Sequence, residues 1–299
     1  MCGRTRLLIG SLALLCLTGC SEDEPAADPD AAPPTTSNSA FDAADTGTIE
    51  GRVVWNGPVP DVSPIVAISS PDGNLPPDGK LLCREPNPFA PRIDPDTHGV
   101  QEAVVFLRGV DPLRSRPWPH GPVQVETRQR QFQTLQDGIA SRVSFVQRGD
   151  TIEAVNRDPK YHSLRARGAA FFNLPLVDPD RPTKRRLDKA GVVELSSGAG
   201  YPWMHAHLFV ADHPYYARTN KKGRFRLEQV PRGSYEIVCW MPSWEIVRKE
   251  RDPESFQLAR IKFAPPVENT ATVVVRRGET DIVGFVWTVD SVAKPRQRD

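Results

Sequence analysis

The chain of 299 residues has little cysteine and methionine, five and three residues respectively, and no excess of charge of either sign. Its 38 basic and 37 acidic residues leave a formal net charge of +1, so the balance gives no sign of a nucleic-acid partner. The sequence also lacks a His-Glu-x-x-His motif, a Gly-x-Ser-x-Gly motif, a phosphate-binding Gly-x-x-x-x-Gly-Lys motif and a Cys-x-x-Cys pair. These absences favour a protein that is not an enzyme.

Long apolar runs are also missing. The run at residues 7–17 is short of the ~20 residues that a transmembrane helix needs. It follows two arginines and ends in Leu17-Thr18-Gly19-Cys20, an arrangement typical of a secretory signal, here residues 1–19. The tetrapeptide resembles the bacterial lipoprotein box. The resemblance implies that Cys20 is lipidated and becomes the first mature residue. An ordinary secreted protein cut nearby is the alternative.

Residues 20–46 have no lysine or arginine and are rich in Asp, Glu, Ala, Pro, Ser and Thr. This composition cannot bury a core and is typical of a disordered acidic tether. We therefore expect an exported protein, lipid-anchored to the membrane of the cell envelope. Ser21 in the second mature position indicates the outer membrane. Residues 291–299 are expected to form a tail.

The remaining residues carry short β-rich runs separated by many of the 30 prolines and 21 glycines. No stretch has helical periodicity over three turns, although a short helix between Glu245 and Leu258 is possible. In the run at residues 223–227, alternation predicts that Arg224 and Arg226 face water while the apolar residues between and after them face inward. Many short strands with such turns predict an all-β fold of sandwiches. The predicted strands are 48–55, 103–110, 123–127, 142–146, 151–156, 192–195, 205–211, 224–229, 234–241, 271–276 and 281–289.

Residues 217–241 resemble the second half of a carboxypeptidase regulatory-like domain. The resemblance rests on a Thr-x-x-x-Gly-x-Phe strand at 219–225 and a Val-Pro-x-Gly-x-Tyr corner at 230–235. Segments typical of the first half, at 49–53 and 103–107, lie far upstream. The resemblance implies a transthyretin-like sandwich, classed among carbohydrate-binding-like folds, without catalytic residues of its own.

A second resemblance lies between those halves. Residues 149–158, followed by Tyr161-His162-Ser163, resemble the cupredoxin strand and loop that bear the first copper histidine. Residues 172–175, 195–204 and 212–216 follow in the order seen in that family. Together the two resemblances cover most of residues 47–290. They indicate cupredoxin-containing envelope proteins of the methylamine-utilisation type.

The copper ligands that this resemblance implies are incomplete. A blue-copper centre uses two imidazoles, one thiolate and a weak axial methionine. His162 and Met204 are present, but Ser197 stands at the thiolate position and Tyr201 at the second imidazole position. We therefore expect no cofactor, the copper having been lost. The alternative is a different metal site that adds His205 or His207, which share one face of a predicted strand; a solvated strand face is the simpler interpretation of that pair.

The predicted fold is all-β, with a cupredoxin-like Greek-key sandwich inserted in, or followed by, a carboxypeptidase regulatory-like sandwich. The first comprises residues 123–216 and the second residues 47–122 plus 217–290. Cys83 and Cys239 are the cysteines left after export and lipidation, and they favour one disulfide over two separate buried thiols.

The predicted function is a non-catalytic binding or scaffold role, with an envelope protein or glycan as partner and no nucleic acid. One alternative is a copper electron carrier with an altered metal site. The other is a glycan-binding module, for which Trp240 and Trp244 could supply a stacking surface, although both are more often core residues.

Overall fold

The computed structural model describes residues 40–68, 82–254, 257–289 and 291. The described residues all belong to one compact unit, which spans residues 39–299. The predicted signal segment, Cys20, most of the tether and nearly all of the tail lie outside the described residues. No helix in the described part of the chain is long and apolar enough to cross a membrane.

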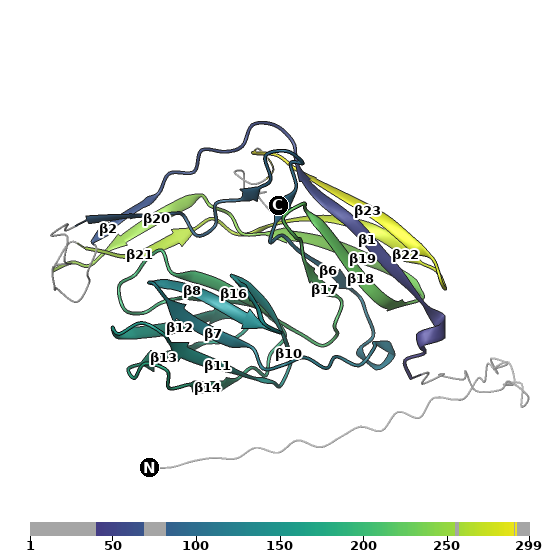
Figure 1. Cartoon of the computed structure of the whole chain (residues 1–299), viewed down its shortest axis with the longest axis horizontal. Coiled ribbons are helices and arrows are strands. Elements are labelled where there is room, and N and C mark those ends of the chain that lie inside the picture. The colour runs from purple at the N-terminus through teal and green to yellow at the C-terminus, as the bar shows by residue number, and fades with distance from the viewer. Residues whose placement is uncertain (1–39, 69–81, 255–256, 290, 292–299) are drawn as a thin grey trace, which may run out of the picture. The chain divides into compact units, whose positions relative to one another are not determined.

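The first sandwich is built from strands at both ends of the sequence. Figure 1 shows the early strand β1 beside the late strand β23, and the two pair in parallel from Thr48 with Thr280 to Trp55 with Trp287. Its three-stranded sheet has the order β18 (Arg224–Pro231), β1 (Thr46–Trp55), β23 (Thr280–Trp287). Its four-stranded sheet has the order β17 (Tyr216–Arg218), β6 (Val104–Arg108), β19 (Gly233–Met241), β22 (Val267–Val275). Buried residues of both sheets, among them Ile49, Trp55 and Ile237, share one hydrophobic cluster.

The second sandwich uses only strands from the middle of the chain. One sheet has the order β10 (Val143–Gln147), β16 (His205–Ala211), β15 (Gly191–Ser197), β12 (His162–Gly168), β13 (Phe172–Leu176). The other has the order β14 (Thr183–Arg186), β11 (Thr151–Asn156), β7 (Gln124–Arg128), β8 (Gln131–Gln136), β9 (Ile139–Ser141). Their inward side chains, including Ile152, Leu164 and Leu208, form a second cluster. The described residues thus form an all-β sandwich fold, as the sequence predicts.

Three short hairpins and two 3₁₀ turns complete the described fold: β2 (Ile65–Ile68) with β3 (Leu82–Glu85), β20 (Ile246–Arg251) with β21 (Leu258–Phe263), β4 (Arg92–Ile93) with β5 (Val100–Gln101), and the 3₁₀ turns Ala43–Asp45 and Pro112–Arg114. Ile65 of β2 and Ile261 of β21 lie in the hydrophobic cluster of the second sandwich. A third cluster joins β6 and β19 of the first sandwich to β10 and β16 of the second through Phe106, Phe209 and Trp240.

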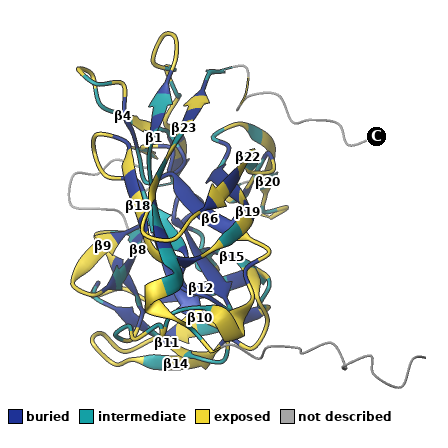
Figure 2. Ribbon diagram, turned by 90° about the vertical axis from the view of Figure 1, so that its right-hand side faces the viewer, coloured by how far each residue is buried: buried dark blue, intermediate teal, exposed yellow. Residues whose placement is uncertain are grey.

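The alternation predicted for residues 223–227 is confirmed. Arg224 and Arg226 on β18 are exposed, whereas Phe225 and Leu227 are buried. Arg226 forms an ion pair with Glu50 on β1, so the basic residues here lie on the outer face of a sheet. Figure 2 shows buried residues on the strands inside the sandwiches and exposed residues on many of the connecting turns.

The prediction of a possible short helix between Glu245 and Leu258 is wrong. That segment contains β20, which pairs with β21 as an antiparallel hairpin whose register shifts twice. Ile246, Leu258 and Ile261 pack on the core of the second sandwich, so tertiary burial decides the local structure. The strand pairing follows the predicted grouping of residues 47–122 with 217–290, but the domain boundaries stay a prediction.

A single glycine tests whether distant segments meet in the first sandwich. Gly223 has φ +73°, and a Cβ there would lie 2.1 Å from the Val53 carbonyl oxygen and 3.0 Å from Gly99 Cα. We expect Gly223→Ala to lower the free energy of unfolding by roughly 2–5 kcal/mol, because a backbone clash adds to a left-handed conformation. Gly278, with φ +69° and open space around it, is the control. Gly278→Ala should cost only about 1–2 kcal/mol in urea unfolding. Equal losses in the two variants would contradict this packing.

Candidate functional site

The four predicted copper-site positions lie together at one end of the second sandwich. His162 begins β12, Ser197 ends β15, and Tyr201 and Met204 lie in the loop before β16. The Ser197 amide donates to the Met204 carbonyl at 3.3 Å, and the Met204 amide donates to the Tyr201 carbonyl at 3.1 Å. The Gly198 amide donates to the Ser163 carbonyl at 2.8 Å. These bonds close the loop and hold it against β12.

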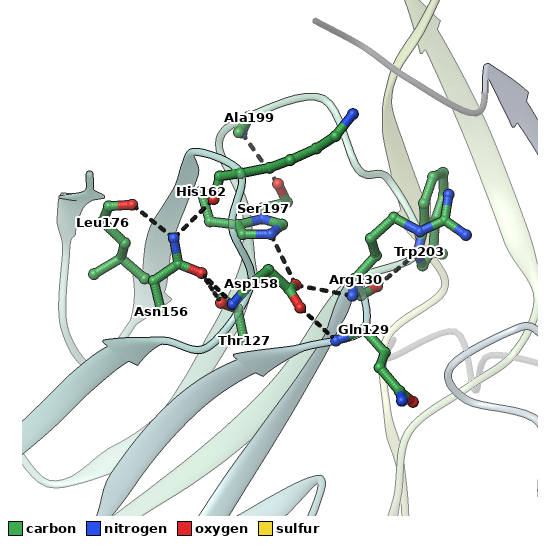
Figure 3. Close-up of polar contacts among 11 residues, drawn as sticks. Thr127, Gln129, Arg130, Asn156, Asp158, His162, Leu176, Ser197, Ala199 and Trp203 are labelled. Carbon is green, nitrogen blue, oxygen red and sulfur yellow. Dashed lines mark hydrogen bonds and ion pairs between the residues drawn. The ribbon is translucent and has the colours of Figure 1, made fainter. Parts of the chain in front are cut away.

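His162 is fully buried and held by Asp158 (Figure 3). Its Nε2 lies 3.0 Å from Asp158 Oδ2, while its Nδ1 is buried and has no hydrogen-bond partner in the described structure. Burial lowers the pKa of His162 below its ordinary value, although the Asp158 carboxylate favours the charged form. A neutral ring with a free Nδ1 can donate a lone pair, so this imidazole could serve as a metal ligand if other donors were present.

Asp158 and Asn156 position the histidine. The Asp158 carboxylate accepts the backbone N–H groups of Gln129 at 2.7 Å and Arg130 at 3.0 Å. The Asn156 side chain bonds to Thr127 at 2.6 Å, to the Leu176 carbonyl at 3.1 Å and to the Asp158 amide at 3.0 Å. Figure 3 shows these bonds forming one network under the imidazole. Sequence reasoning missed this role, although both residues belong to the segment that carries the cupredoxin resemblance.

The other three positions do not complete a copper site. The Tyr201 ring, 3% exposed, lies 5.0 Å from the His162 ring and 5.5 Å from the Trp203 ring. Ser197 Oγ accepts the Ala199 amide at 3.1 Å, so the hydroxyl stabilises the loop backbone. The donors are therefore one imidazole, one alcohol, one phenol and the thioether of Met204, and a soft thiolate is missing. Copper of the blue type does not fit these residues. No group of three or more His, Cys, Asp or Glu side chains with metal-site geometry occurs among the described residues.

His205 and His207 are not on a solvated face, so that interpretation is wrong. They are 4% and 7% exposed, and their rings lie 5.3 and 5.2 Å from the Phe89 ring. His207 also packs edge-on against Trp240 at 5.0 Å. Their shared face is covered by residues distant in sequence, which places both imidazoles in an aromatic layer. Glu194, 3.5 Å from the His205 ring, is the nearest acidic partner recorded for it.

The predicted disulfide is not formed. Cys83 and Cys239 are free thiols, and they belong to different packing environments. Cys83 packs against the second sandwich and donates to the Ala67 carbonyl at 3.6 Å. Cys239 lies in the core of the first sandwich, where it accepts the Trp287 indole N–H at 3.3 Å, and burial raises its pKa to about 12. The alternative was two separate buried thiols; the two thiols are separate, but only Cys239 is buried and Cys83 is half-buried.

Neither tryptophan of the suggested stacking surface is widely exposed. Trp240 is buried between the rings of His207 and Phe209. Trp244 is half-buried, with its ring 6.0 Å from that of Trp55. Trp240 belongs to the packed interior and Trp244 packs partly against it, so the two rings do not form an exposed stacking surface together.

No known protein family matches this chain, and no curated protein does. Among solved structures, a copper-containing nitrite reductase from Thermus scotoductus SA-01 is similar over 35% of this chain, at 19% identity and a TM-score of 0.26. The match spans only 25% of the nitrite reductase chain. A purple cupredoxin from Nitrosopumilus maritimus matches 29% of this chain and 98% of its own, at 17% identity and a TM-score of 0.23. A mutant of amicyanin in the reduced state matches 36% of this chain and 98% of its own, at 15% identity and a TM-score of 0.26. At these TM-scores the likenesses carry no weight for function, which is argued below from the residues.

Proposed function

We propose that the chain is an exported, lipid-anchored protein of the cell envelope with a non-catalytic binding or scaffold role. In this proposal, the second sandwich keeps the loop arrangement of a copper site but has lost the ligands that would bind copper. The observation that carries it is the set of groups around His162. An aromatic ring lies against the imidazole, and the nearby serine hydroxyl is engaged by the loop backbone. A donor set with a single imidazole and no thiolate supports a scaffold over an electron carrier.

The copper half of this proposal is tested by direct titration. Purified wild-type protein should stay colourless with equimolar Cu(II), and its copper resonance should lack the narrow hyperfine splitting of a blue site. The reason is that the intense visible band is a thiolate-to-copper charge transfer, and no thiolate lies between His162 and Met204. Optical absorption and electron paramagnetic resonance provide the measurement. A blue wild-type protein would overturn the proposal.

The anchoring half is tested at Cys20. Intact protein should enter the detergent phase in a phase-separation assay, because each buried methylene of an acyl chain contributes about 0.8 kcal/mol. Cys20→Ser should move the protein to the aqueous phase. Cys16→Ser changes a cysteine within the predicted signal segment and is the matched control, since it should leave partitioning intact. Detergent partitioning that survives Cys20→Ser would refute lipidation at this residue.

A further inference from the structure

A pocket of about 450 Å³ opens where the β8–β9 hairpin approaches residues 86–92. Figure 2 shows β8 and β9 side by side, and the two strands pair from Thr134 with Ser141 to Gln136 with Ile139. The volume is within the range of small-molecule sites. Its wall residues are mostly polar or charged: Asn87, Arg92, Glu102, Gln131, Gln133, Ser141 and Arg142, with Pro86, Pro88, Phe132 and Ala140. A second, smaller cavity shares Arg92, Glu102 and Arg142 with it.

Two guanidinium groups share one carboxylate in this wall. Glu102 Oε1 accepts the Ser141 hydroxyl at 2.6 Å and the Arg142 amide at 3.2 Å. Glu102 Oε2 lies 2.9 Å from Arg92 Nη1 and 3.8 Å from Arg142 Nη2. Burial opposes ionisation of Glu102, but the Ser141 bond and the two arginines outweigh it and lower the pKa of the carboxyl. One negative charge therefore faces two positive ones, and the pocket keeps a net positive charge.

Arg142 is the group with spare bonding capacity. Its side chain is 24% exposed, and its guanidinium donates no hydrogen bond to the residues that the structure describes. Burial, together with repulsion from Arg92, lowers the pKa of Arg142 to about 10, which leaves it charged at neutral pH. A guanidinium has five N–H donors in a fork that matches a carboxylate. A largely buried one without such bonds, at the wall of a pocket, is suited to an anionic ligand.

The same pocket also offers hydrogen-bond acceptors. Gln131 and Gln133 are half-buried on the outward face of β8. Their Nε2 groups donate to Glu85 at 3.5 Å and to Glu126 at 3.1 Å. Each amide oxygen is then available, since the described structure records no donor to either. Acceptors of this kind suit ligand hydroxyl groups, and the rings of Pro86 and Pro88 add apolar surface on which the carbon skeleton of a ligand can pack.

We propose that this pocket binds a small polyhydroxylated carboxylate of the uronic acid class. Arg142 holds the carboxylate, and the side-chain oxygens of Gln131 and Gln133 accept the hydroxyls. Glu102 positions Arg92 and Arg142 through its ion pairs. This inference rests on the binding role proposed above but not on the lipid anchor or on copper. A failed titration would therefore overturn the ligand class and leave the anchoring and copper results unaffected.

Calorimetric titration of the full chain with glucuronate tests the proposal. Wild type should bind glucuronate saturably, and glucose at least about tenfold more weakly, because a hydrogen bond to a charged group is strong. Arg142→Gln should weaken glucuronate binding by about tenfold or more, and Arg142→Lys by less, since the charge stays but the fork is lost. Arg181→Gln is the matched control, because that side chain is 80% exposed and lies outside the pocket. It should leave binding unchanged.

Three results would overturn the proposal: no saturable binding of glucuronate to wild type, equal binding of glucose, or full binding by a folded Arg142→Gln protein. Should Arg142→Gln fail to fold, the double variant Gln131→Leu/Gln133→Leu decides instead. Its substitutions lie on the outward face of β8 and avoid the core. It should weaken glucuronate binding several-fold, and unchanged binding would contradict the assigned hydroxyl contacts.

Discussion

The double variant Ser197→Cys/Tyr201→His should bind Cu(II) and turn blue. It would combine two imidazoles, a thiolate and the thioether of Met204, which is the ligand set of a blue-copper site. The backbone already holds positions 197 and 204 together through the 3.3 Å bond between the Ser197 amide and the Met204 carbonyl. The substitutions therefore change donors and leave the loop connections in place.

His162 favours this outcome. Asp158 occupies its Nε2 at 3.0 Å, so only Nδ1 can bind a metal, and that atom is buried without a partner in the described structure. The ring is neutral near pH 7 because burial lowers its pKa. Tyr201→His replaces the ring that now packs 5.0 Å from His162 with a smaller one. The smaller ring leaves room for a metal ion beside His162 and supplies the second nitrogen donor at that position.

Single substitutions separate the contributions. Ser197→Cys alone should give weak or differently coloured copper binding, since one imidazole is missing. Adding His162→Gln to the double variant should abolish the blue band, and its absorption spectrum with Cu(II) provides the measurement. A double variant that folds, as circular dichroism would show, yet takes up no copper would mean that the loop geometry no longer fits the metal.

The sequence predicts the bounds of two strands rich in apolar residues. The predicted ranges 151–156 and 205–211 coincide with β11 and β16. Strand β8, with the sequence Gln-Phe-Gln-Thr-Leu-Gln, was missed because two of its inward residues are polar. Thr134 and Gln136 are buried and bonded to the carbonyls of Ser141 and Phe145 at 3.0 and 2.8 Å. Hydrophobic alternation cannot reveal an inner face that is satisfied by hydrogen bonds.

The candidate site was predicted only in part, for a similar reason. The positions of His162, Ser197, Tyr201 and Met204 follow from the order of motifs along the chain. The burial of His205 and His207 depends on Phe89 and Phe263, which come from segments more than fifty residues away in sequence. A single strand shows which residues share a face, but it does not show what covers that face.

Acidification should destabilise the protein well before its carboxylates titrate. Burial lowers the pKa values of His207 and His213 from 6.5 to about 4. Glu194 favours the charged form of His207, whereas His205 and Arg142 oppose it. Asp212 favours the charged form of His213. The unfolded chain binds more protons than the folded one between these two pKa values. The free energy of unfolding is therefore highest above pH 6.5 and falls as the pH drops towards 4. Each histidine lowers it by roughly 3 kcal/mol over this range, since one pKa unit corresponds to about 1.4 kcal/mol.

Two such losses are comparable to the whole stability of an ordinary domain, about 5–15 kcal/mol, so acid unfolding is expected. Urea unfolding between pH 7 and 5.5 provides the measurement. In this range the histidines of the unfolded chain take up protons, whereas its glutamates stay mostly ionised, so the lowered pKa values of Glu102 and Glu194 add little to the pH slope. His207→Phe should remove a large part of the pH slope, since a phenyl ring can keep the packing against Phe89 and Trp240. The lowered pKa values of His213 and His162 should supply the rest. His98→Asn is the control: His98 is exposed with φ 55°, a conformation that asparagine tolerates, so this variant should keep the full slope. An unchanged slope in His207→Phe would show that its imidazole is not the group that resists protonation in the fold.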